Sequence, residues 1–116
     1  MKKLIVLTLL ISAALTLRGA DLTGTWAAAV VLDAGNGTAT FTFKQTGEAL
    51  SGTYSGTLGQ AQVTGTVKGD QAEWSFDNEQ VGKVAYKGVL DSAGKMKGTV
   101  TYGQLGAGTF TAEKKS

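Results

Sequence analysis

Apolar and polar residues alternate along most of the chain after residue 20. The clearest case is residues 38–45, where Ala39, Phe41 and Phe43 are separated by threonine and lysine. Successive side chains of a β-strand point to opposite faces, so this alternation is typical of a half-buried strand. No segment after residue 20 shows a helical period of useful length. The pattern therefore predicts an all-β domain.

The alternation, broken by glycine-rich turns, predicts eight strands. They cover residues 22–32, 38–45, 49–55, 61–67, 71–76, 83–90, 95–102 and 107–114. Parallel neighbours need connections of a dozen or more residues, and no connection here is that long. We therefore expect an antiparallel up-and-down meander that closes into a barrel, as eight strands can. An open sandwich with glycines at bulges is the alternative.

A short phrase of apolar residue, any residue, glycine and threonine recurs in these strands. It stands at residues 22–25, 50–53, 63–66 and 96–99. Alternation places each of these glycines on the inner face and each following threonine on the outer face. Glycine normally weakens a strand, but on a concave face it allows the sheet to bend sharply. We interpret the phrase as a device for curvature.

The predicted connections differ between the two barrel ends. Three of them, at residues 46–48, 68–70 and 91–94, are tight and share one end. The longer connections lie at the other end, at residues 33–37, 56–60, 77–82 and 103–106. Because binding residues gather on loops held by a rigid scaffold, a functional mouth is expected at this second end.

Nine aromatic residues fall on the predicted inner face: Trp26, Phe41, Phe43, Tyr54, Trp74, Phe76, Tyr86, Tyr102 and Phe110. If the hairpin between the fifth and sixth strands centres on Gln80, Trp74 faces Tyr86. Tryptophan and tyrosine need a partner for their polar tips, so several of them in one lumen suggest water or a ligand inside. The alternative is that they simply fill the core.

The N-terminus has the layout of a secretory signal peptide. Two lysines follow the first methionine, and residues 4–17 then carry no charge. This run is shorter than the ~20 residues that span a bilayer. The pattern predicts a signal peptide over residues 1–20, cleaved after Ala20, and a secreted or periplasmic domain over residues 21–116. A retained N-terminal anchor is the alternative.

Removal of the signal peptide changes the charge of the protein. The whole chain has 11 basic and 9 acidic residues, and three basic ones (Lys2, Lys3 and Arg18) precede residue 21, which leaves a mature net charge of −1. Such a near-neutral chain gives no electrostatic reason to expect nucleic-acid or membrane binding. The sequence has no cysteine, so an exported form would be stable without disulfides.

The sequence also lacks histidine, the commonest general base and a frequent metal ligand. Asp77 and Glu79 are the best pair of carboxylates, and with Asn78 they could offer oxygens to calcium. They stand in a polar loop, where a solvated turn explains them. We therefore expect no catalytic residues, no metal and no cofactor.

Residues at both ends of the domain resemble a known superfamily. Gly24–Trp26 opens the first strand, and Lys114 ends the last strand on the inward register. This placement resembles the calycins, which include lipocalins, fatty-acid-binding proteins and avidins. Residues 49–55 and 108–111 are similar to the third and last strands of the avidin/streptavidin branch. The resemblance implies an eight-stranded barrel with Gly24, Trp26 and Lys114 as structural signature.

The same resemblance bears on the ligand. Tyr54 matches the tyrosine that hydrogen-bonds the ureido oxygen of biotin, Trp74 matches a pocket tryptophan, and Tyr86 occupies another aromatic position. Other positions of the biotin site carry non-matching residues: Ala28, Val84, Val100 and Gly108. A site built from buried hydrogen bonds loses affinity when most of its polar partners are absent. Biotin is therefore not the expected ligand.

The residues favour a binding module for a small, mostly apolar ligand held in the lumen. Its expected contacts are Phe43, Tyr54, Trp74, Tyr86 and Tyr102. The alternative is a filled barrel that acts through its loops as a protein-interaction or inhibitor-like module. A homo-oligomer is compatible with outward apolar residues that could form a subunit contact: Ala27, Ala29, Val31 and Val89.

Overall fold

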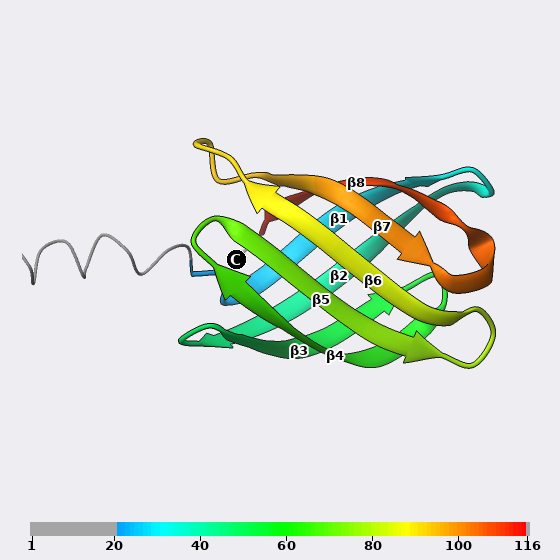
Figure 1. Ribbon diagram of the computed structural model, residues 1–116, viewed down its shortest axis with the longest axis horizontal. Coiled ribbons are helices and arrows are strands. Elements are labelled where there is room, and N and C mark those ends of the chain that lie inside the picture. Colours follow the sequence, from blue (N-terminus) through cyan, green and yellow to red (C-terminus); the bar gives the residue numbers. More distant parts are fainter. Residues whose placement is uncertain (1–20, 116) are drawn as a thin grey trace, which may run out of the picture.

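The computed structural model describes residues 21–115 and shows a closed, eight-stranded antiparallel barrel. Each strand pairs with the next along the chain, and the last strand returns to the first (Figure 1). The strands are β1 (Gly24–Leu32), β2 (Gly35–Thr46), β3 (Ala49–Gly56), β4 (Gly59–Lys68), β5 (Gln71–Asn78), β6 (Gly82–Leu90), β7 (Met96–Tyr102) and β8 (Ala107–Lys114). The predicted up-and-down barrel is confirmed, and the open sandwich is wrong. The predicted signal peptide, at residues 1–20, lies outside the described residues.

The predicted difference in loop length between the two ends is wrong. Only residues 33–34 connect β1 to β2, and only residues 57–58 connect β3 to β4. The longest connection is formed by residues 91–95, at the opposite end of the barrel. The strands continue closer to their turns than expected, because Gly35 and Gly59 take up the positive φ angles that follow each two-residue turn. The β7–β8 connection contains a short 3-10 turn, η1 (Gly103–Leu105).

The side chains alternate between core and solvent as predicted, and the repeated glycines lie on the inner side. A Cβ atom at Gly65 would overlap the carbonyl oxygen of Glu73 on β5. One at Gly98 would overlap that of Lys87 on β6. Neighbouring backbones therefore approach so closely at these points that only glycine fits, a requirement beyond the predicted bend.

One end of the barrel is closed by the start of the domain. Leu22 is buried, and its carbonyl oxygen accepts a hydrogen bond of 2.9 Å from Nε1 of Trp26. Trp26 lies opposite Lys114 in the β1–β8 register, and the amide of Lys115 donates to the carbonyl oxygen of Thr25. The N- and C-terminal segments are thus fixed to each other at this end.

None of the helices in residues 21–115 is long and apolar enough to cross a membrane.

Candidate functional site

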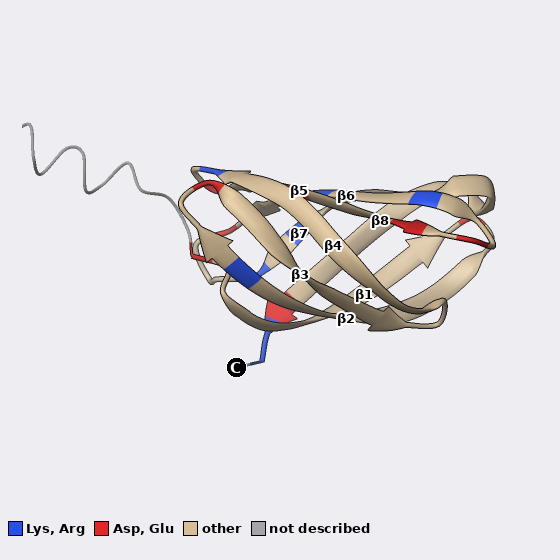
Figure 2. Cartoon of the chain, turned by 90° about the horizontal axis from the view of Figure 1, so that it is seen from below, with Lys and Arg blue, Asp and Glu red and all other residues tan. Residues whose placement is uncertain are grey.

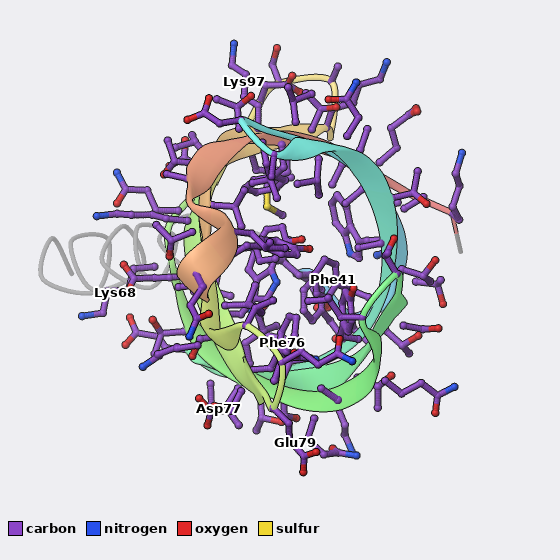
Figure 3. All side chains as sticks on the ribbon, turned by 90° about the vertical axis from the view of Figure 1, so that its right-hand side faces the viewer. Phe41, Lys68, Phe76, Asp77, Glu79 and Lys97 are labelled. Carbon is purple, nitrogen blue, oxygen red and sulfur yellow. The ribbon has the colours of Figure 1, made fainter. Side chains whose placement is uncertain are left out.

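The middle of the barrel is filled by aromatic rings. Trp74 and Tyr86 face each other in the β5–β6 register, as predicted, and stack with their ring centroids 5.3 Å apart. Phe41 and Phe110, from different parts of the wall, both pack edge-on against this pair. Figure 3, a view down the barrel from the mouth, shows side chains across the interior, with Phe41 and Phe76 directed inward. These rings pack against one another in the middle of the lumen.

The indole nitrogen of Trp74 is buried in this cluster and has no hydrogen-bond partner among the described residues. The rings around it offer only weak acceptors for an N–H group. Trp74 therefore contributes packing rather than a hydrogen bond.

A pocket of about 210 Å³ opens at the mouth, the end that holds the β1–β2, β3–β4 and β7–β8 connections. It exists because β2 begins with glycine at two inward positions, Gly35 and Gly37, where side chains would otherwise fill the lumen. A Cβ atom at Gly37 would meet only Thr57 Oγ1, at 3.6 Å. The lining residues are Val30, Leu32, Ala34, Gly35, Asn36, Gly37, Thr38, Tyr54, Thr57, Leu58, Tyr102 and Leu105.

Tyr54 forms part of the pocket wall and is held from three sides. Its ring stacks on Phe76 with centroids 4.3 Å apart, and its hydroxyl oxygen accepts a hydrogen bond of 3.3 Å from the amide of Leu58. Gly56 leaves the space that the hydroxyl occupies, since a Cβ atom there would lie 2.6 Å from it. The Tyr54 hydroxyl is thereby fixed at the pocket.

Tyr102, the second tyrosine of the pocket, forms a hydrogen bond through its hydroxyl with that of Tyr86. Burial raises the pKa of Tyr102 to about 12; the hydrogen bond with Tyr86 opposes the rise, whereas the neighbouring Tyr54 hydroxyl adds to it. Burial and the hydrogen bond to Tyr102 also raise the pKa of Tyr86. Both phenols therefore stay protonated and neutral well above physiological pH.

The charged residues around the pocket are mainly acidic. Leu105, on η1, lines the pocket and is 39 % exposed; the large apolar side chains of Val31 and Val89 are exposed to a greater degree. The charged residues at this end are Asp33, Asp77, Glu79 and Lys83. Figure 2 shows that charged residues gather mostly toward the two ends of the barrel.

A larger open groove, of about 680 Å³, lies on the outer surface of the barrel. It crosses β4 to β7 above the small pair Ser75 and Ala85, which lie opposite each other. Its walls carry threonine hydroxyls and the charged groups of Glu73, Lys83 and Lys87. All of these face solvent, so the groove lacks the buried polar groups that fix a small ligand.

The five residues predicted to contact a ligand are divided between two places. Tyr54 and Tyr102 line the mouth pocket. Phe43, Trp74 and Tyr86 lie deeper, in the packed interior, and only Tyr86 reaches the pocket tyrosines through its hydroxyl.

Asp77 and Glu79 are exposed, and Figure 3 shows both directed away from the barrel axis. The side-chain oxygen of Asn78 accepts hydrogen bonds from the amides of Gln80 and Val81, and these bonds account for the turn of this loop. Among residues 21–115 no three acidic residues are grouped so that they could hold a metal ion.

Several pocket residues were not predicted from the sequence, notably Gly37, Val30, Leu58 and Leu105. Residues 33–37 were expected to form a loop, which hid the inward glycines of β2. The signal was present in the alternation itself: counting back from Ala39 in steps of two places Gly37 and Gly35 on the inner face.

No protein-family model and no curated protein matches this sequence.

Proposed function

We propose that the protein binds a small, mostly apolar molecule in the mouth pocket. The observation that carries this proposal is a mostly apolar hollow that has two buried tyrosines, Tyr54 and Tyr102, among its lining residues. Small-molecule sites typically combine apolar walls with a few fixed polar groups. The volume of about 210 Å³ is below the ~300 Å³ of common ligand pockets, so the ligand is small. It corresponds to roughly seven waters at ~30 Å³ each, about the size of a single ring.

Native mass spectrometry of the protein purified from its own host tests this proposal. The wild-type protein is expected to retain a small organic molecule. The Gly37→Leu variant fills the pocket at a position where a side chain has room, and it is expected to lose that molecule. A matched outward substitution, Thr40→Leu, should retain it. A clean apo mass for the wild-type protein would contradict the proposal.

A second candidate function is a protein-interaction or inhibitor-like module that acts through the mouth loops. The exposed Leu105 on the rim favours it, together with a barrel interior already filled by its own rings. This candidate predicts an apo mass, and it predicts that Gly37→Leu changes nothing whereas Leu105→Ser weakens binding to a protein partner.

We also propose that the protein is exported and that the barrel is of calycin type, with the avidin/streptavidin branch the nearest resemblance. The register pair of Trp26 and Lys114, which joins the first and last strands, supports this relationship. Biotin is not the proposed ligand, and no enzymatic activity is proposed.

A further inference from the structure

The pairing between β4 and β5 stops before either strand ends. Its last pair toward the mouth is Thr64 with Ser75, yet both strands continue, over residues 59–63 of β4 and residues 76–78 of β5. These residues stay paired on their other sides, with β3 and with β6. Among the eight described strands, this is the one neighbouring pair in which both strands run on past their last shared pair. The gap between the two segments is called the β4–β5 seam below.

Backbone hydrogen-bonding groups point into the seam from both sides. The amide of Val67 donates to a carbonyl oxygen just before β3, and successive residues of a strand direct these groups to opposite neighbours. The even-numbered residues of β4 therefore face β5, and the odd-numbered residues of β5 that pair with them, such as Ser75, face β4. Gln60, Gln62 and Asp77 follow the same alternation, but the register gives them no partner across the seam. Such unpaired groups are a template on which a further extended chain can add.

An open groove of about 560 Å³ follows the seam on the outside of the barrel. Behind the seam, the buried rings of Tyr54 and Phe76 are stacked with their centroids 4.3 Å apart. One side-chain hydrogen bond crosses the seam near the mouth, over 3.4 Å from Nδ2 of Asn78 to the carbonyl oxygen of Leu58. The groove is lined by Leu58, Gln60, Ala61, Gln62, Asp77, Asn78, Glu79 and Gln80.

The charge of the groove is negative. Asp77 and Glu79 are exposed among its lining residues, and neither forms an ion pair with another described residue. No lysine or arginine lines the groove, and Lys83 lies opposite Asp77 on the β6 side. A positively charged occupant is therefore attracted to the groove, whereas a negatively charged one is repelled.

We infer that the β4–β5 seam binds an extended segment of a partner polypeptide that carries lysine or arginine. The segment pairs through its backbone with Gln60 and Gln62 of β4. Its cationic side chains reach Asp77 and Glu79. Residues 59–63 span about 17 Å at ~3.3 Å per residue, so roughly five residues of the partner are bound. This inference goes beyond the proposed function, because the groove shares only Leu58 with the mouth pocket.

Three hexapeptides, acetylated and amidated at their ends, test the inference. The first alternates lysine with threonine, and the second alternates glutamate with threonine. The third is the lysine peptide methylated on every backbone nitrogen, which keeps the charge and removes the backbone donors. NMR measures each dissociation constant and the hydrogen exchange of the Gln60, Gln62 and Asp77 amides.

The lysine peptide should bind the wild-type protein and slow the exchange of these three amides. The glutamate peptide should bind at least tenfold more weakly, since it places like charges beside the groove carboxylates. The methylated peptide should bind several-fold more weakly, because net hydrogen bonds are lost, and should leave the exchange unchanged.

Charge-removing variants locate the site. Asp77→Asn combined with Glu79→Gln should weaken the lysine peptide about three- to tenfold, the effect of two exposed ion pairs. The matched control, Asp70→Asn combined with Glu73→Gln, removes the same charge from the paired half of the hairpin and should bind as the wild type does. Gly37→Leu, which fills the mouth pocket, should also bind the peptide normally, so this test is independent of the proposed function.

Several results would overturn the inference. They are failure of the lysine peptide to bind, equal binding of the glutamate or the methylated peptide, and full affinity in the variant that lacks both groove carboxylates. Slowed exchange at the seam without any peptide, growing with protein concentration, would mean that a second copy of the chain occupies the seam, and it would also overturn the inference.

Discussion

The hydroxyl groups of Tyr86 on β6 and Tyr102 on β7 form a buried hydrogen bond that joins the packed interior to the mouth pocket. Burial raises the pKa of both phenols in the folded protein, that of Tyr102 to about 12. The unfolded chain releases these protons near the ordinary tyrosine value of ~10. The folded state therefore holds more protons than the unfolded state once the pH exceeds 10.

This difference predicts a loss of stability in alkaline solution. The contribution of the two protonated phenols to the free energy of unfolding is complete below pH ~10. It declines as the pH rises toward 12, by about 1.4 kcal/mol per pH unit for each phenol. Urea unfolding from pH 8 to 11.5 measures this, and Tyr86→Phe should flatten the slope. An unchanged slope in that variant would show that Tyr86 ionises as easily in the folded protein as in the unfolded chain.

The close approach of β4 and β5 predicts that Gly65 cannot be replaced. Gly65→Ala places a Cβ atom on the carbonyl oxygen of Glu73 and should destabilise the protein by about 2 kcal/mol or more. Gly37→Ala is the matched control, because its nearest contact is an ordinary 3.6 Å, and it should change the free energy of unfolding by less than about 0.5 kcal/mol. Chemical denaturation distinguishes the two, and equal effects would refute a specific contact at Gly65.

We expect the same substitution, tryptophan to phenylalanine, to lower the free energy of unfolding by different amounts at the two tryptophans. Trp26→Phe removes the donor to the Leu22 carbonyl and leaves that oxygen without its partner, which should destabilise the protein by about 1–3 kcal/mol beyond the loss of ring area. Trp74→Phe removes an indole N–H that has no partner among the described residues, so only the loss of ring area remains. Thermal unfolding compares them, and a smaller loss for Trp26→Phe than for Trp74→Phe would contradict this account.

We expect Gly56 to determine where the Tyr54 side chain lies at the pocket. Gly56→Ala brings a Cβ atom to 2.6 Å from the Tyr54 hydroxyl and should move the tyrosine away from the Leu58 amide. The amide signal of Leu58 should shift, because its hydrogen bond to the Tyr54 hydroxyl would be lengthened or lost. If the Leu58 signal is unchanged, Gly56 does not position the ring.

The barrel, its strand order and its inner face could be predicted because each rests on a local pattern. Alternation assigns Ala39, Phe41 and Phe43 to one face without any knowledge of distant contacts. Short connections then leave an antiparallel meander as the only arrangement. The pairing of Trp74 with Tyr86 followed from counting outward from the hairpin at Gln80.

The pocket could not be predicted in the same way. Whether a lumen is filled depends on how rings from different strands pack, and the stacking of Trp74 on Tyr86 with Phe41 and Phe110 is not encoded in any one strand. The glycines at the start of β2 looked like a loop because glycine is the commonest turn residue. Counting back from Ala39 would have placed them on the inner face, but the space they leave depends on the pairing of Gly37 with Val30 and on the packing around it.

The central claim is that a ligand occupies the mouth and not the middle of the barrel. Methyl-labelled NMR during a titration with cyclopentanone tests it most directly, since Val30, Leu58 and Leu105 report on the mouth and Leu22 and Leu50 on the core of the barrel away from it. We predict shifts confined to the mouth methyls in the wild-type protein and no shifts in Gly37→Leu. Shifts centred on Leu22 and Leu50, or mouth shifts that persist in Gly37→Leu, would contradict the claim.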